Sequence, residues 1–112
     1  MQKSLFKEDF RLRRALVPVT GFYEYDKNRI PHYFEEENKN RFYLAAIYHS
    51  SNFVLLTEKP EEAVSYYHPR MPFVIHKKEK SLYLNTETQI KDRINRQRVK
   101  LVDALSPQLS LF

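Results

Sequence analysis

Apolar and polar residues along the first 85 positions form short runs with the spacing of β-strands. These runs are rich in β-branched and aromatic residues, which favour strands, and turn-forming residues separate them. The bend at Thr20-Gly21 and the polar segments 26–29 and 37–40 predict turns. The predicted strands are residues 15–19, 22–26, 32–36, 41–49, 53–57 and 71–76.

Helical patterns flank this strand-rich region. Residues 4–14 predict a short helix, because several apolar residues share one face and Ser4 can cap its first turn. Pro60 and the two glutamates that follow it are typical of the first turn of another short helix. Residues 81–84 fit either a strand or the start of a helix.

The pattern changes from Thr86 onward. Apolar residues at helical spacing, with basic residues around them, predict an amphipathic C-terminal helix that stops before Pro107. Its basic face fits plain solvated surface or a DNA contact. The apolar positions are Ile90, Ile94, Leu101 and Leu105.

The order of these elements predicts a single α+β domain dominated by strands. A length of 112 residues fits one domain, which we place at residues 1–105, followed by a free tail at 106–112. The sixteen Phe and Tyr residues indicate a folded core rather than a disordered chain.

Composition excludes several kinds of chemistry. The chain has no cysteine, so thiolate nucleophiles, zinc thiolates and disulfides are absent, and its single glycine rules out glycine-rich phosphate loops. No apolar run is long enough to span a bilayer, which predicts a cytoplasmic protein without a membrane partner. The net charge of +5 favours a polyanionic partner, but it equally serves solubility. We expect no metal and no cofactor.

Two segments carry residues suited to proton transfer. Glu24 lies among aromatic residues on a strand suited to burial, and burial raises the pKa of an unpaired carboxyl. In the second segment, prolines hold His68 and Arg70 in a stiff stretch, where a histidine can exchange protons and an arginine can grip a phosphate. Taken singly, each has a plainer explanation: a solvent-facing Glu24, and a loop whose His68 caps a helix end.

Together the segments resemble a known family. RRALVPVTGFYEY, PHYF, FYLAAIY, FVLLT and HPRMPFVI occur in the order and spacing of the SRAP family, the SOS-response-associated peptidase or abasic-site-processing domain. The resemblance covers roughly residues 3–85 and rests most on Gly-Phe-Tyr-Glu followed by His-x-Arg-Met-Pro. It implies a mixed sheet or barrel with a cationic groove for single-stranded DNA.

The resemblance also implies roles for particular residues. Glu24 matches the family glutamate that handles protons at the reacting centre, and His68 matches the histidine that assists opening of the abasic sugar ring. Arg70 resembles a contact to the DNA backbone, and we expect Arg13, Arg14 and Tyr23 to add further DNA contacts. The localisation implied is cytoplasmic and nucleoid-associated.

The sequence departs from the family pattern at its start. Family members carry an N-terminal cysteine that crosslinks the abasic aldehyde, and later an Asn-Ala-Arg-x-Glu segment; both are expected upstream of Met1. Ala15, Tyr25 and Ala46 replace the usual Cys, Trp and Gly. The chain therefore resembles the C-terminal part of an SRAP domain, without autonomous crosslinking. It could be a fragment, a degenerate paralogue, one half of a split enzyme, or a chain that pairs with itself.

The last five residues form a second motif. Gln108, Leu109, Ser110, Leu111 and Phe112 resemble the pentapeptide by which proteins bind the bacterial sliding clamp. A glutamine amide and two adjacent apolar anchors suit such a pocket, although a tail packed on its own domain has the same pattern. The favoured function is therefore binding of single-stranded or abasic DNA, and the alternatives are a clamp adaptor and half of an abasic-site crosslinking enzyme.

Overall fold

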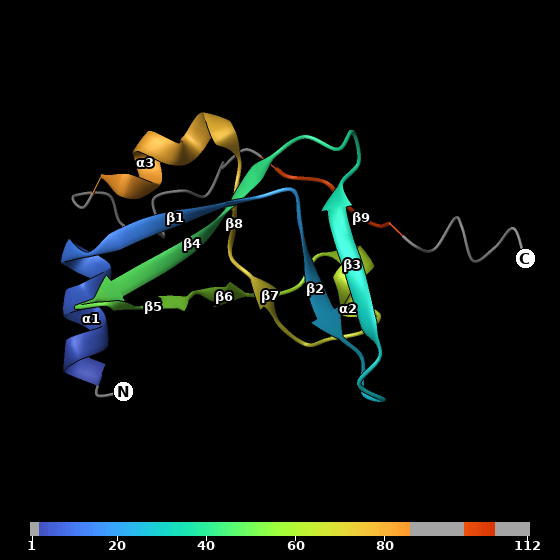
Figure 1. Ribbon diagram of the computed structural model, residues 1–112, viewed down its shortest axis with the longest axis horizontal. Coiled ribbons are helices and arrows are strands. Elements are labelled where there is room, and N and C mark those ends of the chain that lie inside the picture. Colours follow the sequence, from blue (N-terminus) through green and yellow to red (C-terminus); the bar gives the residue numbers. More distant parts are fainter. Residues whose placement is uncertain (1–2, 86–97, 105–112) are drawn as a thin grey trace, which may run out of the picture.

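The computed structural model describes residues 3–85 and 98–104 of the chain, and their side chains from Glu8 onward. Strands dominate, as the α+β prediction requires (Figure 1). The helices are α1 (Lys3–Leu12), α2 (Glu62–Ser65), the 3-10 turn η1 (Lys77–Glu79) and α3 (Lys80–Leu84). The strands are β1 (Arg14–Val19), β2 (Gly21–Tyr25), β3 (Pro31–Glu36), β4 (Phe42–His49), β5 (Asn52–Leu55), β6 (Thr57–Glu58), β7 (Met71–Pro72), β8 (Val74–Ile75) and β9 (Leu101–Asp103).

Strand β4 is the centre of the first sheet. It pairs antiparallel with β1 along one edge and with β5 and β8 along the other. Residues 44–47 are all buried, because this part of the strand is covered on both faces. A strand buried on both faces needs a continuous apolar run rather than an alternating one, and Leu-Ala-Ala-Ile supplies it.

The second sheet follows directly from the first. The chain bends at Thr20, and β2, β3 and β9 form an antiparallel sheet in which β2 and β3 run steeply relative to β1 and β4 (Figure 1). Gly21 is the first residue of β2, and the Tyr33 ring leaves no room there for a side chain. A Cβ at this position would be 2.4 Å from the ring and 2.6 Å from the Phe34 carbonyl oxygen. The single glycine of the chain thus admits a close aromatic contact.

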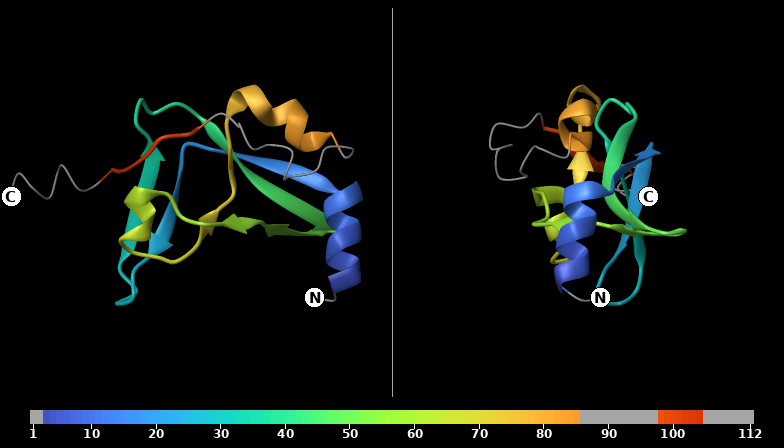
Figure 2. Two further views of the ribbon diagram at one scale, coloured as in Figure 1. Left: turned by 180° about the vertical axis from the view of Figure 1, so that it is seen from behind. Right: turned by 90° about the vertical axis from the view of Figure 1, so that its left-hand side faces the viewer.

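Two apolar clusters hold these layers together. In the first, Phe22 and Phe34 face each other across β2 and β3 and meet Phe42 of β4 and Val64 of α2. In the second, Tyr83 of α3 packs against β4, and its hydroxyl donates to the Ala46 carbonyl at 2.7 Å. Figure 2 shows α1 crossing the end of the first sheet and α2 lying beside the second.

Arg14 ties the N-terminal helix to the first sheet. Its side chain is buried, and its guanidinium donates to the carbonyls of Phe10, Tyr83 and Asn85 at 2.6 to 3.0 Å. The Phe10 ring lies 4.3 Å from the guanidinium carbon. A buried arginine is tolerated when its donors are satisfied, so this side chain joins α1, β1 and α3.

Two predicted strands are interrupted in the structure. The segment 53–57 is divided at Leu56, and the segment 71–76 is divided at Phe73. Both interrupting residues are buried, and their backbones bond each other and Ala45: Phe73 donates to Leu56 at 2.8 Å, and Leu56 donates to Ala45 at 2.9 Å. Local sequence does not reveal such bends, because they depend on packing against β4. Residues 81–84, whose sequence fits either a strand or a helix, belong to α3.

The predicted C-terminal helix is wrong where the structure describes it. Residues 98–100 are irregular, and β9 pairs with β3 over residues 101–103. The reason is that buried and exposed residues alternate here with the period of a strand: Val99 and Leu101 are buried, and Lys100 is exposed. Residues 86–97 and 105–112 of that helix and tail lie outside the described residues. Within residues 3–85 and 98–104, no helix is long and apolar enough to cross a membrane.

The Gly21–Tyr33 contact makes a testable prediction. Gly21→Ala should lower the free energy of unfolding by about 1–3 kcal/mol, because the added methyl overpacks the tyrosine ring and the Phe34 carbonyl. Urea denaturation would measure it, with the exposed-loop variant Ser51→Ala as control, expected within about 0.5 kcal/mol of wild type. A Gly21→Ala chain as stable as the control would contradict the close packing.

Candidate functional site

The candidate site lies on the inner face of β2 and β3. Alternation along β2 places Glu24 on the same face as the core residue Phe22, and Glu24 pairs across the strands with His32. The Glu24 side chain is only 18% exposed. The core therefore ends in a carboxylate rather than in another apolar residue.

The structure brings Glu24 and His68 together. His68 follows α2, and its Nδ1 lies 3.9 Å from Oε1 of Glu24. Burial raises the pKa of Glu24, and the nearby His68 opposes the shift without cancelling it. A carboxyl with a raised pKa holds its proton closer to neutral pH, so it is suited to donate and accept protons.

The backbone orients the His68 ring. Its Nδ1 lies 2.7 Å from the Arg70 carbonyl oxygen and 3.1 Å from the Arg70 amide nitrogen. A protonated Nδ1 donates to the carbonyl, whereas an unprotonated Nδ1 accepts from the amide. Either way, Nδ1 is engaged by the main chain, which leaves Nε2 as the ring nitrogen for an external group.

A second histidine cluster adjoins this pair and was not predicted. Nε2 of His32 lies 2.9 Å from Asp26, and its Nδ1 lies 3.8 Å from Asp103 of β9. The His32 ring stacks on Tyr67 at 3.7 Å, the residue before His68. Hydrogen bonds from His32 and the backbone lower the pKa of Asp26 despite burial. The sequence signal was the period of two, which places Glu24 and Asp26 on one face.

Tyr67 links the two clusters. Burial, with the charge and hydrogen bond of Asp103, raises the pKa of the Tyr67 phenol, so its hydroxyl stays protonated and donates to the carboxylate. Because Tyr67 is held by both His32 and Asp103, the turn that carries His68 is held as well. The arrangement supports general acid–base chemistry at Glu24 and His68.

Comparison with known proteins identifies the family. The model of the SOS response associated peptidase (SRAP) family matches residues 1–107. The chain belongs to the SRAP family. It is 27% identical over 97 residues to the abasic site processing protein YobE of Bacillus subtilis (strain 168), an alignment covering 75% of this chain. It also shares its fold with a crystal structure of a protein from Bacteroides thetaiotaomicron, at a TM-score of 0.69 and 24% identity over 81% of this chain.

The SRAP chain is shorter than these relatives. It spans 44% of the B. subtilis protein and 46% of the B. thetaiotaomicron chain. The resemblance read from the sequence is thus confirmed at the level of the family. The activity and partners of a whole SRAP protein remain proposals for this chain.

The predicted DNA contacts of this SRAP chain fall into two groups. Arg70 is exposed, and its guanidinium lies 3.2–3.3 Å from the Thr57 hydroxyl, close behind His68 in sequence. Tyr23 is 60% exposed on the outer face of β2, where it lies 4.8 Å from the Tyr33 ring. The period of two that turns Glu24 inward turns Tyr23 outward, so the two residues do not share a face.

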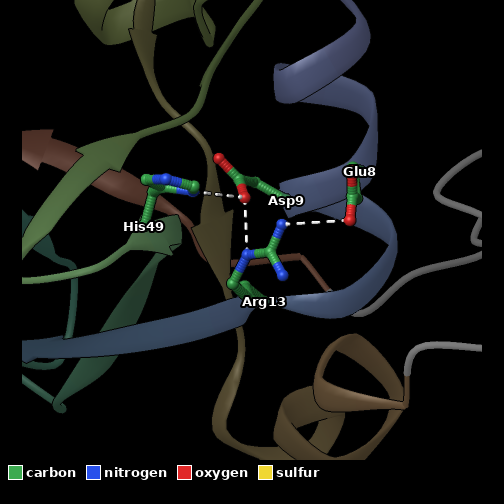
Figure 3. A network of polar contacts seen from close by, with 4 residues as sticks. All are labelled: Glu8, Asp9, Arg13 and His49. Carbon is green, nitrogen blue, oxygen red and sulfur yellow. Dashed lines mark hydrogen bonds and ion pairs between the residues drawn. The ribbon is translucent and has the colours of Figure 1, made fainter.

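Arg13 and Arg14 are occupied within the fold. The Arg13 guanidinium donates to Asp9 at 2.6 Å and lies 3.7 Å from Glu8, and His49 approaches the same Asp9 oxygen at 3.3 Å (Figure 3). Burial opposes ionisation of Asp9, but the hydrogen bonds and charges of Arg13 and His49 outweigh it and lower its pKa. Arg14 serves the buried carbonyls described above. Both guanidiniums thus already have partners within the described residues, and a DNA contact by either arginine stays a prediction.

Two expectations concern other ligands. Residues 108–112, the predicted clamp motif, lie outside the described residues, and clamp binding stays a prediction. No group of three or more His, Asp or Glu residues within the described ranges has the arrangement of a metal site.

The partly buried Glu24 predicts a pH dependence of stability. Because its folded pKa is raised, the folded state binds a proton more tightly, and stability should fall as pH rises from the ordinary glutamate value of 4.5 through the folded pKa. Glu24→Gln should remove this pH-dependent loss of stability, because glutamine does not titrate. The variant should therefore gain stability relative to wild type as pH rises. Urea denaturation between about pH 4 and pH 8 would measure it. The control is Glu62→Gln at an exposed site on α2, and identical pH profiles for the two variants would contradict a raised pKa at Glu24.

Proposed function

We propose that this SRAP chain recognises abasic sites in single-stranded DNA through Glu24 and His68. The observation that carries the proposal is the 3.9 Å approach of these side chains at the end of the apolar core. Membership of the SRAP family and similarity to a protein named for abasic site processing support the choice of ligand. The net charge of +5 favours a polyanion.

The chemistry of an abasic sugar suits this pair. The closed sugar is a hemiacetal, and opening it to the aldehyde removes one proton from the C1 hydroxyl and adds one to the ring oxygen. Such a step needs a base and an acid within reach of one another. Glu24 has a raised pKa, and the main chain engages only Nδ1 of His68, so each residue can hold either role as protons shift.

Arg70 supplies the cation in this proposal. It lies two residues after His68, is exposed, and makes no ion pair with another described residue. Among the residues that the structure describes, its guanidinium has one side-chain partner, the neutral hydroxyl of Thr57, which leaves the guanidinium charge available. A guanidinium can bind a phosphate with two parallel hydrogen bonds, which positions the sugar at the neighbouring pair.

Binding to labelled DNA tests this function. Fluorescence anisotropy should show the chain binding a single-stranded oligonucleotide that contains an abasic site, most tightly at low salt. Arg70→Gln should weaken binding about tenfold and reduce the slope of log affinity against log salt by about 0.7, the value for one phosphate contact on a single strand.

The matched control is Arg11→Gln, which removes an exposed arginine from α1. It should change affinity far less than Arg70→Gln does. Absence of binding at low salt would overturn the proposal, and equal effects of the two variants would remove Arg70 from it.

Glu24→Gln should reduce the preference for abasic over intact DNA while leaving affinity for intact DNA unchanged.

The exposed edge of the first sheet favours a second, enzymatic function. Strand β5 ends that sheet, all four of its residues are exposed, and Phe53 is 61% exposed. An apolar edge strand is a ready template for another strand. We propose that it can pair with an SRAP segment bearing the N-terminal cysteine that these 112 residues lack, which would complete an abasic-site crosslinking enzyme.

A mixing experiment tests the enzymatic proposal. The chain, combined with a cysteine-first SRAP segment, should give an SDS-stable adduct on abasic DNA, and Phe53→Glu should reduce the yield severalfold by placing a charge on the edge. Leu84→Glu, at an exposed apolar residue of α3, is the control. Equal yields from both variants would rule out β5 as the docking edge, and absence of any adduct would rule out the enzyme.

A further inference from the structure

A small basic pocket lies apart from Glu24 and His68. Its volume is about 60 Å³, room for a few water molecules or one tetrahedral oxyanion. Three segments of the chain form it: the β3–β4 connection, η1 and the stretch before β9. The polar side chains that line it are Glu36, Asn40, Arg41, His76, Lys77 and Arg98.

The charges around this pocket favour an anion. Arg41, Lys77 and Arg98 bring three positive charges against one carboxylate, that of Glu36. That carboxylate already accepts from the backbone amides of Asn38 and Asn40 at 2.9–3.0 Å. The lining therefore carries an excess of two positive charges in a concave site.

The cations have weak partners. Among residues 3–85 and 98–104, neither Arg41 nor Lys77 forms an ion pair, and both are exposed. Arg98 lies 3.8 Å from Glu61 with its side chain 68% exposed, and such surface pairs contribute little free energy. An arriving anion would thus displace solvent rather than strong internal contacts.

His76 adds a neutral donor. Its Nδ1 accepts a hydrogen bond from the Lys78 amide at 3.1 Å. With Nδ1 acting as an acceptor, the neutral ring carries its proton on Nε2. A guanidinium, an ammonium and an imidazole N–H are the donors that phosphate oxygens accept in proteins.

We propose that this pocket binds a phosphate group. The group could belong to a nucleic-acid backbone or to a free phosphorylated small molecule, since both present the same oxyanion. The site does not use Glu24, His68 or Arg70, so it stands independently of the proposed abasic-site function.

Inorganic phosphate is the probe for the site itself. Titrating phosphate into the ¹⁵N-labelled full chain should give saturable NMR shifts concentrated on the amides of Asn40, Arg41, Lys77 and Val99. Arg41→Gln should raise the apparent Kd at least tenfold, whereas Arg11→Gln, an exposed arginine on α1, should leave it within twofold. Shifts scattered over the surface, or equal losses in both variants, would overturn the proposal.

The same variants distinguish the source of the phosphate. If single-stranded DNA is the ligand, Arg41→Gln should lower DNA affinity several-fold more than Arg11→Gln, and DNA should compete with phosphate for the shifted amides. If the ligand is a small molecule, phosphate affinity should fall while DNA affinity stays unchanged. Both results support the pocket. Since the phosphate titration needs no DNA, failure of abasic-site binding would not be mistaken for failure of this site.

Discussion

The pairing of Phe22 with Phe34 across β2 and β3 decides where the candidate site of this protein lies. Both rings are buried against β4 and α2, and this burial holds the inner face of the second sheet toward the core. Because side chains alternate along a strand, Glu24 and His32 must then lie on that same face, two cross-strand pairs further along. A slip of one residue would turn both outward, so the apolar pair and the polar site cannot vary independently.

Contacts with neighbouring residues hold the side chains around Glu24 and His68 in place. His32 is held between Asp26 and Asp103 and stacks on Tyr67, and Tyr67 in turn bonds Asp103. His68 follows Tyr67 directly and is held by the Arg70 backbone. Three segments distant in sequence thus converge on one histidine–carboxylate pair, which is how a small domain can hold two side chains in a fixed geometry.

Positive charge in this protein serves two different purposes. Arg13 and Arg14 satisfy a buried carboxylate and buried carbonyls, so they stabilise the join between α1 and the first sheet. Arg70 and the cations around the basic pocket face solvent and have weak partners within the described part of the chain. The net charge of +5 is therefore a poor guide to a binding surface until each cation has been placed.

The amino-acid sequence alone determined the strand-rich α+β class, the bend at Gly21, most strand positions and the family. These follow from local periodicity and from motifs whose residues are neighbours in the chain. Tertiary structure alone decided that Arg14 is buried, that Leu56 and Phe73 interrupt their strands, that Leu101 belongs to β9, and that His32 stands beside Glu24. Each of these features depends on which distant segment packs against the residue, and the local pattern of residues along the chain does not specify such contacts.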